Sequence, residues 1–179
     1  MHSMTQVAVM ALGLGALPIG PERVAEQSRL THEAVVSGAL DEVWAAWTTK
    51  SGLEAWMVGH AELDLRIGGK MRTLYDPAGK LGDPATIENT IISYDPKRML
   101  SIKVRKTPRD FPFARAIKSM WTVIYFEAES ATKTRVKIVG LGFGDDDESK
   151  RMRAFFDRGN ALTLRQLQRY FASSADGEK

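Results

Sequence analysis

The chain has 179 residues, of which 44% are hydrophobic and 26% charged, as in an ordinary globular protein. Its 25 Lys and Arg residues exceed its 22 Asp and Glu residues by only three, which gives no strong bias toward polyanionic partners. The sequence has no cysteine, which excludes disulfides, zinc–thiolate sites and thiol catalysis. At this length one domain with a substantial core is expected, burying roughly 70% of the surface of the unfolded chain.

The first segment, residues 1–26, is set apart from the predicted fold. Within it, "VAVMALGLGALPIGP" is uncharged and apolar but too short to span a bilayer, so no transmembrane segment is predicted. No Lys or Arg precedes this stretch and no clean small-x-small cleavage site follows it. Two interpretations stay open, a degenerate or clipped export signal and a mobile leader of a cytoplasmic protein. The localisation is therefore undecided. The domain is predicted at 27–174, with a tail at 175–179.

The first predicted elements are a strand and two short helices. "SRLTHEAVVS" (28–37) alternates, with one side formed by Leu30, His32, Ala34 and Val36. "GALDEVWAAWTT" (38–49) changes to helical spacing, with apolar residues at Leu40, Val43, Trp44 and Trp47. "SGLEAWM" (51–57) predicts a second short helix with Ser51 as its N-cap.

Two adjacent glycines, Gly68 and Gly69, interrupt the next alternating stretch, "AELDLRIGGKMRTLYDP". Before them, period two places Glu62 and Asp64 on a wet face and Ala61, Leu63, Leu65 and Ile67 on the core side. A phosphate-binding loop would lead into a helix N-terminus, but strands are predicted on both sides. The glycines therefore indicate a hairpin corner, and the two acids indicate a solvated face with basic cross-strand neighbours.

Further strands are predicted at 85–94, 98–105, 119–127 and 133–141, rich in Val, Ile, Thr and aromatics. The last element, 145–171, is a long helix in which Asp145 and Glu148 predict a capping box. Its predicted apolar stripe consists of Met152, Phe155, Phe156, Gly159, Thr163, Leu167 and Tyr170. Because an antiparallel sheet must cover its apolar face, we expect this helix to lie across it.

The order of these elements, with "DEVWAAWTTKSGLEAWM", "LDLRIGGKMR", "WTVIYFEAESATKTRVKI" and "FFDRGNALTLRQLQRYF", resembles the START-like (SRPBCC) superfamily. Within it, the chain is most similar to the branch named for the activator of the Hsp ninety ATPase. The resemblance implies an α+β helix-grip fold, in which a curved antiparallel sheet of about six to seven strands wraps around the C-terminal helix. Members include polyketide cyclase-like, lipid-binding and co-chaperone proteins, so the fold alone does not choose a function.

The candidate site is the space between sheet and terminal helix, which is either a ligand cavity or packed core. Met and aromatic side chains suit an adaptable apolar pocket. Asn160, between Phe156 and Leu164, needs a hydrogen-bond partner if it is buried. The predicted lining is Trp56, Met71, Tyr75, Met99, Trp121, Phe156 and Asn160, with Met71 and Tyr75 facing the helix. The predicted rim is Phe111, Phe113 and Arg115.

The segment "VRKTPRDFPFARAIK" (104–118) combines basic residues with two phenylalanines. It is interpreted as a cavity lip, a partner-binding loop or a plain solvated loop. Nucleic acid is not expected, because no basic stripe accompanies it. The favoured function is binding of a small hydrophobic or amphipathic molecule. The alternatives are a co-chaperone-like module that stimulates a chaperone ATPase and a cyclase- or hydrolase-like enzyme.

No cofactor, metal or catalytic residue is predicted. "GLGFG" (140–144) lacks the third glycine of a dinucleotide motif, and the acids that follow would repel a pyrophosphate. These acids also lack the spacing of an EF-hand loop. The three histidines, His2, His32 and His60, show no metal-ligand spacing, and no acid/base pair is evident.

Overall fold

The computed structural model describes residues 28–176, so the predicted leader at 1–26 and the last three residues lie outside the described part. The strands of this part are β1 (Leu30–Val36), β2 (His60–Leu63), β3 (Lys70–Leu74), β4 (Ile87–Asp95), β5 (Met99–Lys106), β6 (Trp121–Ser130) and β7 (Lys133–Leu141). Its helices are α2 (Leu40–Thr48), α3 (Lys50–Trp56), the single-turn 3-10 helix η1 (Ala116–Lys118) and α4 (Asp147–Asp176).

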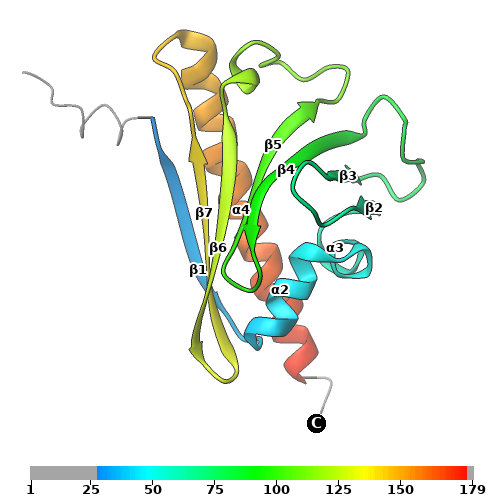
Figure 1. The fold of residues 1–179 in the computed structure, drawn as a ribbon, viewed down its shortest axis with the longest axis vertical. Helices are drawn as coiled ribbons and strands as arrows, with labels where there is room; N and C mark the ends of the chain where they lie inside the picture. The colour runs from blue at the N-terminus through cyan, green and yellow to red at the C-terminus, as the bar shows by residue number, and fades with distance from the viewer. Residues whose placement is uncertain (1–27, 177–179) are drawn as a thin grey trace, which may run out of the picture.

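The seven strands form one antiparallel sheet in the order β1-β7-β6-β5-β4-β3-β2. Strands β2 to β7 are sequential neighbours, and β1 joins the far edge by pairing with β7, where Leu30 lies opposite Gly140. Figure 1 shows α4 running along one face of the sheet, while α2 and α3 close one end. The predicted α+β helix-grip fold is confirmed.

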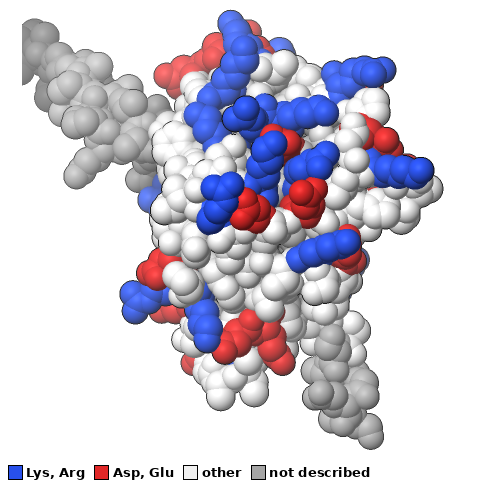
Figure 2. Space-filling model, turned by 45° about the vertical axis from the view of Figure 1, so that its right-hand side comes forward, with Lys and Arg blue, Asp and Glu red and all other residues white. Residues whose placement is uncertain are grey.

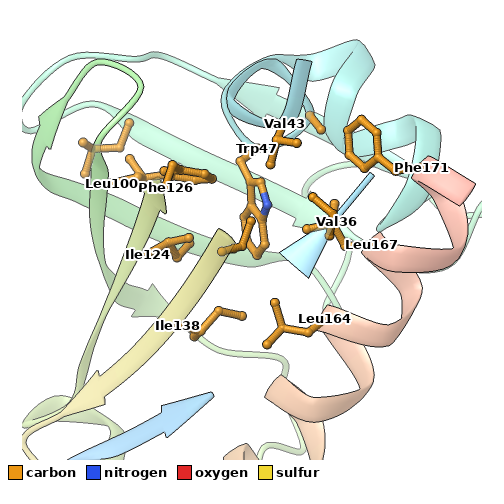
Figure 3. Packing of buried hydrophobic residues seen from close by; sticks show 13 residues of the cluster. Val36, Val43, Trp47, Leu100, Ile124, Phe126, Ile138, Leu164, Leu167 and Phe171 are labelled. Atoms are coloured by element: carbon orange, nitrogen blue, oxygen red, sulfur yellow. The ribbon is translucent and has the colours of Figure 1, made fainter. Parts of the chain in front are cut away.

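The core packs α2 and α4 against one face of the sheet, which we call the inner face. Trp47 of α2 lies among side chains from three elements, including Ile124 of β6 and Leu167 of α4 (Figure 3). Its ring makes edge contacts with Trp56 at 5.1 Å and Phe126 at 6.3 Å between centroids. Because side chains alternate along a strand, this packing fixes the inner face of β5 and β6 as Leu100, Ile102, Val104, Thr122, Ile124 and Phe126.

The buried stripe of α4 differs from the predicted one. Leu164 and Phe171, which were left out of the prediction, are 4% and 6% exposed, whereas Phe155 is 43% exposed. Met152 and Leu167 are fully buried, as expected. The predicted stripe was therefore rotated by part of a helical turn. Phe155 and Phe156 are adjacent, so either of them fits an apolar stripe at helical spacing, and the sequence does not show which one is buried.

The N-terminus of α4 is capped by Asp146 and not by the predicted Asp145. Its carboxylate accepts hydrogen bonds from the backbone N–H groups of Glu148 at 3.1 Å and Ser149 at 3.3 Å. The Ser149 hydroxyl also donates to it at 2.7 Å. Three consecutive aspartates are chemically equivalent in the sequence, and only the backbone path selects the cap. Glu148 is thereby left to make contacts outside the helix.

The second short helix also begins earlier than predicted, because Thr49 and not Ser51 is the N-cap. The Thr49 hydroxyl accepts from the Gly52 N–H at 2.9 Å and donates to the carbonyl of Ala45 at 2.8 Å. One side chain therefore ends α2 and starts α3. The tight corner brings Trp56 back to α2, where its indole N–H donates to the Ala46 carbonyl at 3.0 Å.

The corner at Gly68-Gly69 is architectural, as predicted, but the strand before it is shorter. β2 ends at Leu63, and Gly68 adopts a φ of +78°, which favours glycine. The Gly68 N–H donates to the carbonyl of Ile91 at 2.8 Å, which ties the corner to β4. Because alternation stops at Leu63, Ile67 is 68% exposed and the prediction that it faces the core was wrong.

Candidate functional site

An uncovered strip of the inner face is the main candidate site. The backbone of helix α4 lies closest to β1, with fewer close approaches to β7, η1 and α3, and on β4 and β5 its core cluster includes Ile91 and Leu100. Further along β5, Ile102 and Val104 point to the inner face and yet remain partly exposed. Partly exposed Leu63 and Leu65 continue this strip toward α3.

The predicted lining residues Trp56 and Met71 lie at the α3 end of this strip. Trp56 packs partly buried against the main core through Trp47. Met71 of β3 is 3% exposed and packs with Leu53 and Ala61. Both are near the predicted place, but Met71 is enclosed by side chains, so it contributes packing rather than free surface.

Three predicted lining residues lie elsewhere. Met99 and Trp121 alternate with inner-face residues Leu100 and Thr122, and they therefore point to the opposite, outer face of the sheet. Tyr75 lies just beyond β3 and is 58% exposed, so it is not enclosed between β3 and α4 as expected. Placing these residues requires the pairing register of the strands, which the alternation of apolar and polar residues in the sequence does not give.

The predicted rim residues close the other end of the strip. Phe111 and Phe113 contact each other at 5.5 Å between centroids and contact Phe155 of α4 at 5.9 and 5.7 Å. Phe155 in turn contacts Phe156, at 5.5 Å. Phe113 is 8% exposed. The loop is thus packed onto the helix by its aromatic residues, and it does not present them as a free patch.

A carboxylate fastens this loop to the start of α4. Glu148 accepts hydrogen bonds from the backbone N–H groups of Arg115 at 3.0 Å and Ala116 at 3.1 Å, and from the Arg115 Nε at 2.9 Å. The Ala116 N–H is the main cause of a lowered pKa of Glu148. The Glu148 hydrogen bond in turn raises the pKa of Arg115, which also contacts Asp146 at 3.1 Å.

Four side chains of the described part have a buried polar atom without a hydrogen-bond partner: Trp47 at Nε1, Arg153 at Nε, and the two that concern the site, Asn160 and His32. Asn160 lies on the inner side of α4, as predicted, and its Nδ2 is one of these atoms. Another is Nδ1 of His32 on β1, whose Nε2 lies 3.1 Å from the carboxylate of Asp157. A buried polar atom that lacks a partner is costly, so a group that satisfies it is expected.

The two most prominent hollows in residues 28–176 contain no predicted site residue. One, of about 690 Å³, lies where α2, α3 and the end of α4 meet, between Gly38, Thr49 and Tyr170. The other, of about 470 Å³, lies on the outer face between Lys97, Tyr125 and Arg135. A preformed cavity between sheet and α4 therefore stays a prediction.

The outer face of the sheet carries a cluster of cations around Glu88. Lys70 and Arg105 lie 3.6 and 3.5 Å from its Oε1, and Arg72 lies 3.9 Å from its Oε2. Arg72 also donates to Glu62 at 2.8 Å, which confirms that Glu62 belongs to a wet face with a basic cross-strand partner. Figure 2, with the β2–β5 side turned forward, shows Lys and Arg crowded among a few acids.

Within residues 28–176 no group of three or more His, Asp or Glu side chains is placed to hold a metal ion. None of the helices in this part of the chain combines the length and hydrophobicity needed to cross a membrane. Sequence analysis missed several inner-face positions, including Asn89 and Thr122. The signal available for them was a polar residue within an otherwise apolar alternating strand.

The seven-stranded antiparallel sheet with the long helix α4 along one face (Figure 1) is the helix-grip fold of the START-like superfamily. The family model described as activator of Hsp90 ATPase homolog 1-like protein matches residues 39–172, and the chain belongs to this family. No curated protein matches the chain in sequence.

Solved structures share the fold at low sequence identity. Protein MLL2253 from Mesorhizobium loti has a TM-score of 0.63 at 15% identity, with 81% of this chain and 97% of that chain covered. The Aha1 dimer from Colwellia psychrerythraea has a TM-score of 0.62 at 13% identity, with 80% and 95% covered. CalU16 from Micromonospora echinospora has a TM-score of 0.57 at 16% identity, with 82% and 78% covered.

Proposed function

We propose that the chain binds a small hydrophobic or amphipathic molecule along the uncovered strip of the inner face. The observation that carries this proposal is the partial exposure of Ile102 and Val104, which belong to the core side of the sheet. Exposed apolar area on an inner face is unfavourable in water, and a ligand that covers it gains about 25 cal/mol per Å².

The surroundings of the strip support this function. Trp56 and Met57 lie at one end, and Phe111, Phe155 and Phe156 lie at the other. Apolar walls with a few polar groups are typical of small-molecule sites. Met71 and Phe113 act in this proposal as packing that shapes the strip.

The test is a titration of the purified protein with N-phenylnaphthylamine, a neutral fluorescent probe, together with native mass spectrometry for a co-purified ligand. Val104→Gln is expected to weaken probe binding about fivefold, because it places an amide on the strip. Lys103→Gln is the matched control, since Lys103 is adjacent on β5 but faces the other way. Equal effects of the two substitutions, or no probe binding at all, would refute ligand binding at this strip.

The second candidate is a co-chaperone-like protein–protein module, which the family description and the likeness to the Aha1 dimer support. The basic cluster of Lys70, Arg72 and Arg105 is the surface that suits it, with an acidic partner. Arg105→Glu would then abolish stimulation of the ATPase of a purified chaperone, whereas Val104→Gln would leave it intact. The opposite result would favour the strip.

A further inference from the structure

The apolar interior is divided by a row of polar residues. One cluster, which we call the helix-end cluster, contains Val43, Trp47, Phe126, Leu167 and Phe171 with their neighbours. The second, which we call the loop-end cluster, contains Phe113, Ile117, Met120, Phe143 and Met152 with their neighbours. The two clusters are built from the same strands and the same helix, so the boundary between them requires a cause in the sequence.

Three elements pass from one cluster to the other at a polar residue. On β1, His32 separates Leu30 of the loop-end cluster from Ala34, which packs on the helix-end cluster. At the start of β6, Thr122 separates Met120 from Ile124 in the same way. On α4, Asn160 separates Phe156 from Leu164. We call His32, Thr122 and Asn160 the polar band.

The register places the two strand residues of the band close together. His32 lies opposite Ile138 of β7, and Thr122 lies opposite Gly140, one inner-face position along the same strand. Two strand spacings separate β1 from β6, which is about 10 Å. Helix α4 lies against β1, where Asp157 contacts His32, and Asn160 follows one turn later on the inner side. The three residues therefore lie in one row between α4 and the sheet.

The band is not satisfied by the protein itself. Asn160 Nδ2 and His32 Nδ1 are buried and without a partner, and the Thr122 side chain makes no hydrogen bond in the described part of the chain. Asn89 extends the row toward β4. It pairs with Met71 and Val104, is 8% exposed, and its side chain likewise has no partner in that part. The buried, unpartnered atoms of Asn160 and His32 destabilise the empty protein, whereas the polar atoms of Thr122 and Asn89 are not among the buried ones.

The unsatisfied atoms have complementary chemistry. In the neutral His32 ring, the Asp157 carboxylate next to Nε2 favours the proton on that nitrogen, and Nδ1 is then an acceptor. The Asn160 amide Nδ2 is a donor. A single hydroxyl group, donating to Nδ1 and accepting from Nδ2, satisfies both. A carboxylate does not fit, because it cannot donate to Nδ1 and it would approach Asp157.

We propose that the polar band recognises an uncharged hydroxyl group on an otherwise apolar, ring-containing ligand, whose rings lie on the strip along Ile102 and Val104. This inference rests on the proposed ligand-binding function and specifies the ligand class. Arg153, also on α4, donates to the Arg29 carbonyl at 2.9 Å, while the Asp157 carboxylate beside His32 disfavours an anion at the band. The ligand is therefore a neutral alcohol or phenol.

The test compares three probes that share one ring system: naphthol, methylnaphthalene and naphthoate, each substituted at the same carbon. Calorimetric titration of the full chain is expected to give naphthol an affinity roughly five- to tenfold above that of methylnaphthalene, from hydrogen bonds made in the band. Naphthoate is expected to bind most weakly. With Asn160→Leu, naphthol and methylnaphthalene are expected to bind with about equal affinity. With Thr122→Val, the preference for naphthol is expected to be reduced but not lost.

Gln166→Leu is the matched control, because it makes a similar amide-to-apolar change on the exposed side of α4. It is expected to retain the naphthol preference. A second measurement separates ligand recognition from a purely structural role. Asn160→Leu removes an unpartnered buried donor, so the melting temperature of the ligand-free protein is expected to rise. A fall would mean that Asn160 is already satisfied, and it would overturn the inference.

The outcomes distinguish this inference from the proposed function. If none of the probes binds the folded wild-type chain, both fail. If the probes bind but naphthol and methylnaphthalene have equal affinities, or if Asn160→Leu keeps the preference, ligand binding stands and the polar band is refuted. If naphthoate binds most tightly, the site is one for anions, and the neutral hydroxyl is wrong.

Discussion

Strand β5 crosses two regions of the inner face that differ in how they are covered. At its start, Leu100 lies under α2 and α4 and is fully buried. Four residues later on the same face, Val104 is partly exposed. The strand, the face and the residue class are the same, so the difference comes from what covers each residue: the cluster with α2 and α4 over Leu100, and the cluster with the 111–120 segment beside Val104. Stability is concentrated where two helices meet the sheet, and available surface remains where they do not.

The largest expected effect compares these two residues directly. Leu100→Ala is expected to destabilise the protein by about 3 kcal/mol, because it leaves a cavity among rigid neighbours. Val104→Ala is expected to cost about 1 kcal/mol, because part of its surface is already in water. Urea unfolding of both variants measures the difference. Equal losses would show that the strip is as well packed as the core.

A second comparison uses two glycines. A Cβ at Gly38 would lie 2.5 Å from the Phe171 ring, so Gly38→Ala is expected to destabilise the junction of α2 and α4 by about 1–3 kcal/mol. A Cβ at Gly159, within α4, meets nothing within 4 Å. Gly159→Ala is expected to stabilise the protein by about 0.5–1 kcal/mol through helix propensity. Thermal unfolding measures both, and a destabilised Gly159→Ala would contradict open space beside α4.

A third prediction concerns the loop that closes the open region. The pKa of Glu148 is lowered from its ordinary value of 4.5, mainly by the Ala116 N–H, so its contribution is full above that value. It is lost as the pH falls through the lowered pKa, and the hydrogen-exchange protection factors of 107–118, relative to the intrinsic rate at each pH, are expected to fall there. Glu148→Gln is expected to show fast exchange at neutral pH as well.

Asp147→Asn serves as the control for that experiment. It removes one negative charge from the same first turn of α4, but Asp147 makes no hydrogen bond or ion pair with the loop in the described part of the chain. Its effect is limited to the helix dipole. If both variants exchange alike, the fastening of the loop depends on the charge of the helix end and not on Glu148.

The smallest effect is expected on the outer face. Arg72→Gln removes one cation beside Glu62 and Glu88, but Glu62 is 60% exposed and Glu88 keeps Lys70 and Arg105. A change of about 0.5 kcal/mol or less is expected, decreasing with added salt. A large loss in urea unfolding would show that the outer face contributes to stability as strongly as the inner face does.

Much of the fold was predictable from period two in the strands and the long amphipathic helix. Asn160 was also predictable, because an amide between Phe156 and Leu164 breaks an apolar stripe. Met99 and Trp121 were not, since a shift of one residue in a strand exchanges its two faces. Their true face depends on which neighbours contact α4, and this is decided by pairing between distant strands.

The pairing of β1 with β7 has a consequence for synthesis of the chain. Leu30 pairs with Gly140, which is synthesised 110 residues later. The carbonyls of Arg29 and Val35 accept hydrogen bonds from Arg153 and Gln168, which are synthesised later still. At about 5–20 residues per second, the delay between the two strands leaving the ribosome is roughly 5–20 s. During that time β1 and α2 have neither their sheet edge nor α4. A nascent chain of this protein therefore exposes the apolar face of α2 until α4 has left the ribosome.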